Sequence, residues 1–438
     1  MAKKRILILG AGLAGLSAAW HLQSQGIDCQ IFEKESDVGG LCRSKNINGF
    51  TFDYDGHVLH FKHRYTLNLI RSLLKDNLAS HQRKSWIYSH RRYTRYPFQA
   101  NLYGLPSQIV KECLLSFLKA SQKQAPEIKK RESFLAWINH TFGEGISRHF
   151  MVPYNRKFWT IPPEELTCEW LDGFIPVPSL NDLVDGTIQE SKKQFGYNAH
   201  FWYPKRGGIS SLARALAEPL DNIRTNCNIA EINLKKKEMR LASGEKERFD
   251  YLVSTIPLPR MSGIIGDLPQ DIKHLFGFLR WNSIFNLNLG VKNKINPARH
   301  WVYFPEKELS FFRVGFAHNF SSNNVPRGQG SLYVEVSYPF GGSIDKNKLI
   351  RRIKEDLKEI GIIDREEHIC CQDVNDIKYG YPIYDKNYRE SRAKITEYLL
   401  MNDIIPCGRY GSWRYLSMEE AILDGKSAAQ RIAEIKCA

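Results

Sequence analysis

The chain has 438 residues, a formal net charge of +15, and hydrophobic and charged fractions of 42% and 25%, which are ordinary for a soluble globular protein of two or three domains. No apolar stretch approaches the roughly 20 residues that span a bilayer, and the N-terminal apolar run leads into a glycine turn rather than a signal-peptide cleavage site. Nine cysteines without CxxC spacing indicate reduced thiols and a cytoplasmic location. There is no helix-turn-helix, zinc-finger or RNA-recognition motif, so nucleic-acid binding is not expected.

The first predicted unit is a strand, a glycine turn and a helix. The apolar run Ile6–Leu9 predicts a buried strand, Ala14–Gln25 a helix, and the following residues a second strand that ends at Glu33. Three glycines in GxGxxG spacing join strand and helix: Gly10, Gly12 and Gly15. Such glycines make the tight turn, let a pyrophosphate approach the backbone and let the helix pack on the strand, while the acidic residue accepts from ribose hydroxyls. The unit predicts dinucleotide binding; an ordinary glycine-rich βαβ turn is the alternative.

A second glycine pair indicates which dinucleotide to expect. Gly39 and Gly40 follow Glu33, so the backbone can approach the ligand again, and Arg43 offers a guanidinium to a pyrophosphate oxygen. This EKxxxxGG pattern resembles the FAD segment of amine-oxidase-like flavoproteins and favours FAD over a nicotinamide cofactor. A solvated Arg43 is the alternative.

The later segments predict a discontinuous FAD domain formed by residues 1–90, 201–260 and 396–438. Its further expected elements are a helix after the glycine turn that follows Tyr203, strands at Asn228–Leu234, Glu238–Leu241 and Phe249–Pro257, a strand at Ile404–Cys407, and a final helix from about Met418 to Ile435.

Two insertions are expected within this domain. Residues 91–200 show helical periodicity, as in Phe134–Ile138, and predict a helical domain. Residues 261–395 predict an antiparallel-sheet substrate domain, in which Phe285–Val291 alternates apolar residues with Asn286, Asn288 and Gly290 as a half-buried strand does. His300–Phe304, Leu309–Phe316 and Ser331–Tyr338 are its predicted neighbours. The expected fold class is α/β: a Rossmann-type, glutathione-reductase-like FAD domain with two inserted domains and a ligand site between them.

The positive charge gathers in runs such as His90–Arg95 and Lys235–Lys237. Such runs are usually solvated faces, although they also suit an anionic ligand or peripheral contact with an acidic membrane. The predicted helix Ser107–Lys119 carries apolar residues along one side, which favours a core-facing helix over a membrane-lying one. Oligomerisation is left open.

Long segments along the chain resemble one enzyme family. They are HQRKSWIYSHRRYTRYPFQANLYGLP, HFMVPYNRKFWTIP, GYNAHFWYPKRGG, HWVYFPEKELSFFRVGF, YGYPIY and GRYGSWRYLSMEEAILDG. They are similar to the UDP-galactopyranose mutases, and to the eukaryotic branch of that family more than the bacterial one. The match runs in order from near residue 5 to near residue 430, and phrases such as YPFQxN, PYNxKxW and GSWRY are specific.

The resemblance implies a cytoplasmic FAD-dependent isomerase of polysaccharide or glycoconjugate biosynthesis that interconverts the pyranose and furanose forms of a nucleotide sugar. In that family N5 of reduced flavin is the nucleophile at the anomeric carbon, and the reductant is a nicotinamide cofactor, NAD(P)H, or an external one. The protein then contributes positioning and charge stabilisation. A departing diphosphate needs arginines, whose planar guanidinium groups meet phosphate oxygens bidentately.

The family motifs carry site roles onto particular positions of this chain. Arg313 and Arg409 match the family's pair of diphosphate arginines, Tyr381 and Tyr415 match tyrosines that hydrogen-bond the same group, and His57 matches a histidine beside the isoalloxazine. Further substrate positions are Tyr96, Gln99, Asn155, Trp159, Asn198 and Tyr303. The expected cofactor contacts are Gly10, Gly12, Ala14, Gly15, Glu33, Lys34, Gly39, Gly40, Leu41, Arg43, His57, Gly408, Ser417 and Met418.

Simpler roles for some of these residues stay open. Arg313 lies in a strand-like run and could face solvent, while Trp159 and Tyr96 could be core aromatics. An HxxHxxH set is formed by His57, His60 and His63, but the surrounding sequence predicts a strand and not a helix. No cluster of carboxylates or cysteines lies next to these histidines in the sequence. No metal site is therefore expected.

One departure from the family pattern matters for function. The family carries an arginine on a mobile loop after PYNxKxW, whereas this chain has Phe174 near that position and no arginine between Arg156 and Arg206. A lysine could substitute for this arginine, although an ammonium group cannot bind phosphate through two parallel N–H groups as a guanidinium does. The candidates are Lys157, Lys192, Lys193 and Lys205. The departure keeps two alternatives open: an amine-oxidase-like FAD oxidoreductase of the desaturase or protoporphyrinogen-oxidase type, and a flavoprotein that serves only in binding or assembly.

Overall fold

A five-stranded parallel sheet forms the base of the N-terminal part, in the order β19-β13-β1-β2-β9. The computed structural model describes residues 4–122, 130–171, 173–196, 198–293, 295 and 298–437. The five strands come from three separated parts of the chain: β1 (Ile6–Leu9), β2 (Gln30–Phe32), β9 (Ile223–Arg224), β13 (Tyr251–Ser254) and β19 (Ile404–Pro406). β1 and β13 are wholly buried, as expected for parallel strands covered on both faces.

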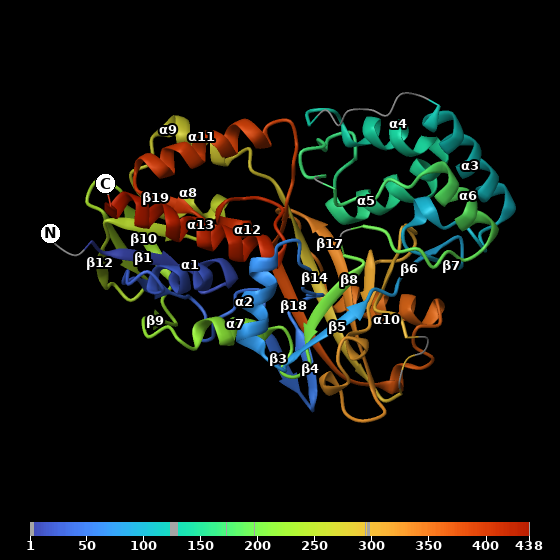
Figure 1. The fold of residues 1–438 in the computed structure, drawn as a ribbon, viewed down its shortest axis with the longest axis horizontal. Helices are drawn as coiled ribbons and strands as arrows, with labels where there is room; N and C mark the ends of the chain where they lie inside the picture. The colour runs from blue at the N-terminus through green and yellow to red at the C-terminus, as the bar shows by residue number, and fades with distance from the viewer. Residues whose placement is uncertain are drawn as a thin grey trace.

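Helices from both ends of the chain pack together beside this sheet. α1 (Leu13–Gln23) and α13 (Met418–Cys437) lie side by side in Figure 1. They approach so closely that a Cβ on Gly425 would lie 2.3 Å from the carbonyl oxygen of Ala14. The remaining elements of this part are α2 (Arg64–Leu74), α7 (Ser210–Ala217), α8 (Leu258–Ile264), α9 (Gln270–Phe276), α11 (Tyr388–Met401), α12 (Gly408–Gly411) and the antiparallel strands β10 (Ile229–Asn233), β11 (Glu238–Leu241) and β12 (Lys246–Arg248).

A seven-stranded sheet stands in the middle of the molecule, in the order β18-β14-β17-β16-β15-β6-β7. Its strands are β6 (Ser85–Ser89), β7 (Arg92–Arg95), β14 (Trp281–Val291), β15 (Trp301–Tyr303), β16 (Arg313–Gly315), β17 (Gly330–Pro339) and β18 (Ile369–Pro382). Most come from residues 261–395, but β6 and β7 enter from earlier in the chain, with β6 parallel to β15.

The half-buried pattern expected for β14 is wrong, because every residue of this strand is buried. Its asparagines face structure rather than water. Asn288 donates to the carbonyl oxygen of Asp53 at 3.0 Å, and Asn286 accepts from Asn375 at 3.0 Å. The polar residues therefore satisfy buried backbone and one another across an interface.

The upper right of Figure 1 is helical: α3 (Ser107–Ser121), α4 (Phe134–Ile146), α5 (Val152–Trp159) and α6 (Leu180–Ile188). α3 and α4 touch at glycines, since a Cβ on Gly143 would lie 2.3 Å from the carbonyl oxygen of Ser116. α10 (Lys346–Glu359) covers the central sheet on the side away from these helices, and β3 (Ser44–Ile47), β4 (Phe50–Asp53), β5 (Leu78–Gln82) and β8 (His200–Pro204) form two small two-stranded sheets.

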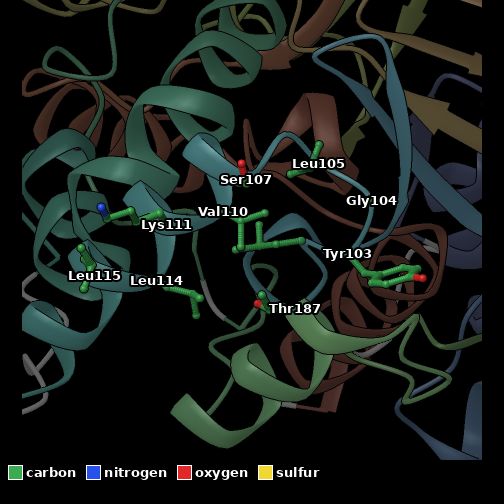
Figure 2. A pocket seen from close by; sticks show the side chains of 10 residues that line it. Tyr103, Gly104, Leu105, Ser107, Val110, Lys111, Leu114, Leu115 and Thr187 are labelled. Atoms are coloured by element: carbon green, nitrogen blue, oxygen red, sulfur yellow. The ribbon is translucent and has the colours of Figure 1, made fainter.

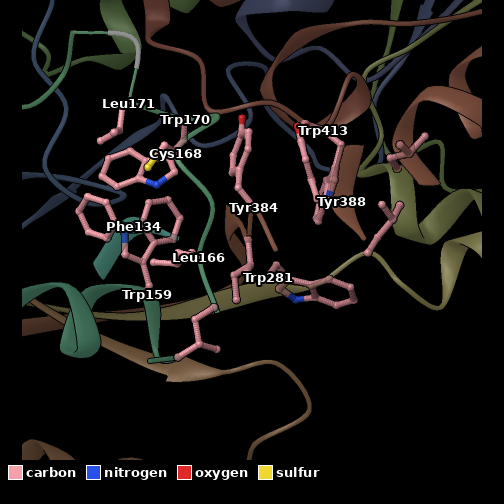
Figure 3. Close-up of a cluster of buried hydrophobic side chains, with 14 of the residues drawn as sticks. Phe134, Trp159, Leu166, Cys168, Trp170, Leu171, Trp281, Tyr384, Tyr388 and Trp413 are labelled. Carbon is pink, nitrogen blue, oxygen red and sulfur yellow. Dashed lines mark hydrogen bonds between the residues drawn. The ribbon is translucent and has the colours of Figure 1, made fainter. Parts of the chain in front are cut away.

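One apolar core joins the helical part to the rest of the chain. Figure 3 shows aromatic side chains from α4, α5, β14, α11 and the segment after α12 in a single cluster: Phe134, Trp159, Trp170, Trp281, Tyr384, Tyr388 and Trp413. The parts are thus fixed against one another by buried aromatic surface. None of the helices described is both long enough and apolar enough to cross a membrane.

Candidate functional site

The GxGxxG turn has the shape that a dinucleotide pyrophosphate needs. Gly10 has φ +98° and a Cβ there would lie 2.3 Å from Oγ1 of Thr255, while a Cβ on Gly15 would lie 2.0 Å from the carbonyl oxygen of Gly10. At Gly12, however, the nearest atom to a Cβ is Cα of Gly40 at 3.9 Å. Gly12 caps α1 without a side-chain hydrogen bond, so the helix N-terminus presents its N–H groups to a ligand.

The acidic residue and the second glycine pair lie against this turn. Oε2 of Glu33 accepts from the N–H of Ala11 at 2.7 Å, and the N–H of Gly39 donates to the carbonyl oxygen of Ala11 at 2.7 Å. Nε of Arg43 donates to the carbonyl oxygen of Gly40 at 2.8 Å, which fixes the guanidinium beside the glycines. This arrangement fits the expected dinucleotide.

One of the predicted C-terminal cofactor positions, Gly408, reaches the same turn from the other end of the chain. Gly408 has φ +77°, and a Cβ there would lie 2.5 Å from Cβ of Ala14. Met418 begins α13, and Ser417 directly precedes it, where its Oγ accepts from the N–H of Glu420. Lys34 does not join this group, since its side chain is 57% exposed and pairs with Glu35.

Arg409 lies beside two stacked tyrosines that the sequence assigned to the same ligand. Its guanidinium carbon is 5.3 Å from the ring centroids of both Tyr381 and Tyr415, and these rings stack with centroids 5.5 Å apart. Nε of Arg409 donates to the carbonyl oxygen of Leu416 at 2.6 Å, which orients the remaining donors. Burial raises the pKa of Tyr381, so the hydroxyl beside Arg409 and Tyr415 is neutral. Leu41 and Tyr381 pack against the same apolar cluster, which connects the glycine loop to this site.

Arg313 does not face solvent. It stands directly opposite Tyr303 on β15 and Glu335 on β17, so three neighbouring strands bring these side chains to one face of the sheet. Nη2 of Arg313 donates to Oε1 of Glu335 at 2.5 Å and Nε donates to Oε2, a bidentate pair in which the carboxylate is fully buried. Sequence reasoning missed Glu335, because a lone glutamate in a strand gives no signal of its partner.

His57 lies within the influence of both arginines. Burial, followed by the charges of Arg409 and Arg313, lowers its pKa to about 4, although a hydrogen bond with the backbone of Asp55 opposes this shift. The imidazole is therefore neutral at neutral pH. Its Nδ1 is buried and has no hydrogen-bond partner among the residues that the structure describes, so it can meet a bound ligand.

A second residue that sequence reasoning missed, Arg83, contacts Tyr96 and Asn198, which were predicted to bind the nucleobase and ribose. It is 4% exposed, its guanidinium carbon lies 4.6 Å from the ring centroid of Tyr96, and it donates to Oδ1 of Asn198. The rings of Tyr96 and Tyr303 are 5.2 Å apart, which links this end to Arg313. Gln99 lies nearby in sequence, 1% exposed, with Nε2 bonded to the carbonyl oxygen of Pro176 and Oε1 buried without a described partner.

Two expected substrate residues lie behind this surface rather than on it. Trp159 is fully buried, with its ring 6.1 Å from that of Tyr381 and 6.2 Å from that of Tyr415. Asn155 is 5% exposed and donates to the carbonyl oxygen of Met151 at 2.8 Å. Both support the residues that face the site.

Phe174 packs edge-on against Tyr415 with ring centroids 4.9 Å apart, and Nζ of Lys62 lies 5.4 Å from the Phe174 ring. Lys157, an expected substitute for the missing arginine, instead donates to the carbonyl oxygens of Phe304, Glu306 and Phe311, and burial lowers its pKa to about 7. Lys193 pairs with Asp182 at 2.5 Å. Lys62 is thus a cation beside this loop that the sequence did not suggest.

One cavity among the described residues lies apart from this site. An apolar cavity of about 490 Å³ lies between α3 and α6 (Figure 2), but its lining, which includes Tyr103, Leu105 and Val110, contains none of the expected site residues. No group of three or more metal-ligating side chains occurs among the residues described.

Comparison with known proteins places this geometry in context. The family model for flavin containing amine oxidoreductases matches residues 13–433. A solved structure described as reduced UDP-galactopyranose mutase superposes with a TM-score of 0.93 at 28% identity, covering 99% of this chain and 96% of that chain. UDP-galactopyranose mutase of Mycoplasma pneumoniae is 19% identical over 98% of this chain and 96% of its own. The 4,4'-diapolycopene oxygenase of a Methylomonas species is 42% identical over 84% of each chain.

Proposed function

The chain belongs to the flavin containing amine oxidoreductase family, and within that family we propose that it is a nucleotide-sugar mutase, which interconverts the pyranose and furanose forms of a sugar held on a nucleoside diphosphate. Membership implies FAD, and the glycine loops fit that cofactor. When bound and reduced, FAD supplies the electron pair that attacks the anomeric carbon. NAD(P)H or another external reductant would deliver the electrons.

The observation that carries the proposal is the placement of Arg409 against the stacked rings of Tyr381 and Tyr415, with the charges of both Arg409 and Arg313 acting on His57. Two guanidinium groups and several phenol hydroxyls form a site for a polyanion. Arg409 and Arg313 would bind the diphosphate and stabilise its charge as the glycosidic bond breaks, and the tyrosines would donate to its oxygens.

The other residues position the substrate and exclude water. Tyr96, Arg83 and Asn198 would hold the nucleobase end, with the guanidinium of Arg83 fixing the Tyr96 ring from one side. Trp159 and its aromatic neighbours back the site with buried apolar surface, which keeps water from a reactive sugar. Neutral His57 can accept or donate a hydrogen bond at Nδ1 beside the cofactor.

A second candidate, an FAD-dependent oxidoreductase that acts on an apolar substrate, is favoured by the likeness to 4,4'-diapolycopene oxygenase. The charge of the site argues against it, because Arg409, which lies against tyrosine rings and donates to a backbone carbonyl, would be buried against a hydrocarbon without an anionic partner, which is costly. The solved mutase structure also superposes on 99% of the chain with a TM-score of 0.93.

A turnover experiment separates the two candidates. Holoenzyme reduced with dithionite is given UDP-, GDP- and dTDP-sugars under anaerobic conditions, and the ring form of the product is determined by NMR. The mutase predicts a furanose from at least one nucleotide sugar, formed only by reduced enzyme and without net oxidation. Bleaching of oxidised flavin by substrate, without a ring change, contradicts the mutase and supports the oxidoreductase.

A further inference from the structure

Behind Arg313 lies a second carboxyl group. The side chain of Asp55 makes a hydrogen bond with that of Glu335, the residue that Arg313 binds through two nitrogens. Glu335 is fully buried, while Asp55 is partly buried and its Oδ1 accepts from the N–H of Gly56 at 2.8 Å. Two carboxyl groups can share a hydrogen bond only when one of them carries a proton.

The backbone holds Asp55 in place for this contact. Its φ of +104° is one that aspartate rarely adopts, and such conformations persist where the surroundings impose them, often at functional sites. The ring of Tyr333 packs against Gly56, which follows Asp55, and against Gly315 on β16. A Cβ on Gly56 would lie 2.5 Å from this ring, and a Cβ on Gly315 only 1.8 Å. Asp55 therefore has little freedom to turn away from Glu335.

The charges around Asp55 are few. From the surrounding elements it faces Arg313 on β16, Glu335 and Tyr333 on β17, Tyr410 on α12, and His57 in its own loop. Burial raises the pKa of both tyrosines and lowers that of His57 to about 4, so these three groups are neutral at neutral pH. Burial, and then the charge of Glu335, raise the pKa of Asp55 well above its ordinary value. With one proton on the carboxyl pair the cluster is neutral, and without it the net charge is −1.

We propose that Asp55 and Glu335 share one proton behind Arg313, and that this proton is what allows Arg313 to bind an anionic diphosphate. The diphosphate as ligand rests on the proposed function. Loss of the proton leaves Arg313 facing two carboxylates, which outweigh its charge and repel the ligand. Asp55 acts through Arg313 and is a positioning residue.

The test measures proton uptake when an anion binds to the holoenzyme. UDP and inorganic pyrophosphate are titrated calorimetrically in two buffers of different ionisation enthalpy, from about pH 7 upward, where terminal phosphates with a pKa near 6 are largely ionised. Once the pH exceeds the raised pKa of Asp55, wild type is expected to take up close to one proton per anion, and the Kd to rise about tenfold per pH unit. Binding without proton uptake and with a flat pH profile at all these pH values overturns the proposal.

Variants assign the proton to its residue. Asp55→Asn keeps the shape of the side chain and tolerates the positive φ, so it is expected to bind both anions without proton uptake and with little pH dependence. Asp76→Asn, at a carboxylate that is 83% exposed, is the matched control and should behave as wild type. Asp55→Asn with full proton uptake contradicts the assignment. Should it lose its flavin or fold, Glu335→Gln gives the same readout, because it too abolishes the shared proton.

The pyrophosphate titration separates this inference from the proposed function. Proton-linked pyrophosphate binding by an enzyme that turns over no nucleotide sugar supports the Asp55–Glu335 pair and contradicts the mutase. Turnover together with proton-free binding supports the mutase and contradicts the pair. A holoenzyme that binds neither anion contradicts both.

Discussion

Tyr381 and Tyr415 stack with their ring centroids 5.5 Å apart and their planes 27° apart, although one lies at the end of β18 and the other follows α12. The guanidinium of Arg409 lies against both rings. The pair therefore joins the central sheet to the C-terminal segment at the point where an anion would bind, and each member can donate a hydroxyl to it.

Arg409 is expected to contribute to substrate binding and turnover but not to cofactor retention. Charge-assisted hydrogen bonds are worth about 1.5–3 kcal/mol each, so Arg409→Ala should weaken UDP binding by about tenfold to 150-fold and lower turnover at least as much. Arg409→Lys should recover only part of the loss, because lysine keeps the charge without the fork. Calorimetric Kd values, with flavin content from visible absorbance, check this; unaltered UDP affinity in Arg409→Ala would refute the role.

Gly12 tests the cofactor site without disturbing the protein. A Cβ there has its nearest protein atom at 3.9 Å, so Gly12→Ala should fold with a wild-type melting profile. The methyl group would still hold a pyrophosphate off the helix N-terminus, and FAD affinity should fall about tenfold or more. Gly263→Ala, in α8 with nothing within 4 Å of its Cβ, is the control and should keep its FAD. Equal FAD retention in both variants would mean that the ligand does not approach Gly12.

Phe174 is expected to accept an arginine with a gain in affinity. Its ring lies 4.9 Å from that of Tyr415, so a guanidinium at this position could reach an anion bound beside Arg409. Phe174→Arg should tighten UDP binding by up to about a hundredfold. The loss of the aromatic contact with Tyr415, worth about 0.5–1.5 kcal/mol, reduces this gain. Phe174→Leu should lose only that contact. A Phe174→Arg variant that binds UDP no better than Phe174→Leu would show that the loop lies too far from the diphosphate.

His57 predicts a loss of stability in mild acid. Its pKa falls from 6.5 to about 4 in the fold, so between these values the unfolded chain binds a proton that the folded chain does not. Stability is then fully present above about pH 6.5 and is lost as the pH falls toward 4. Because other buried histidines share this behaviour, the measurement compares the variant His57→Asn with wild type. In thermal unfolding, His57→Asn should lose less stability than wild type between pH 6.5 and pH 4. Parallel pH profiles would contradict the burial of a neutral His57.

The elements nearest the N-terminus were predictable from sequence because their signals are local. β1 occupies the expected Ile6–Leu9, and α1 begins within one residue of its prediction. β14 was misjudged because alternation cannot reveal that a second layer covers the polar face, where Asn288 meets the backbone of Asp53. β16 spans only Arg313–Gly315 of the expected Leu309–Phe316, although the backbone of Phe312 still bonds to Glu335 and that of Phe316 to His300.

Within the candidate site, sequence named the residues that belong to recognisable motifs and missed those defined by a partner. Arg409, Tyr381 and Tyr415 were expected together and lie together. Glu335 was not expected, because its role depends on its contact with Arg313 on the neighbouring strand. Arg83 was not expected, because its role depends on its contact with Tyr96, which is distant in sequence. No rule of spacing reports such long-range contacts.

Positional isotope exchange tests the central claim most directly, because it follows the bond between the sugar and the diphosphate. UDP-galactopyranose labelled with oxygen-18 at the glycosidic oxygen is incubated anaerobically with reduced and with oxidised holoenzyme, and the label is followed by phosphorus NMR. The mutase account predicts that reduced enzyme scrambles the label into the non-bridging positions and that oxidised enzyme does not. A label that stays in place with reduced enzyme, in a protein that binds both FAD and UDP, would contradict it.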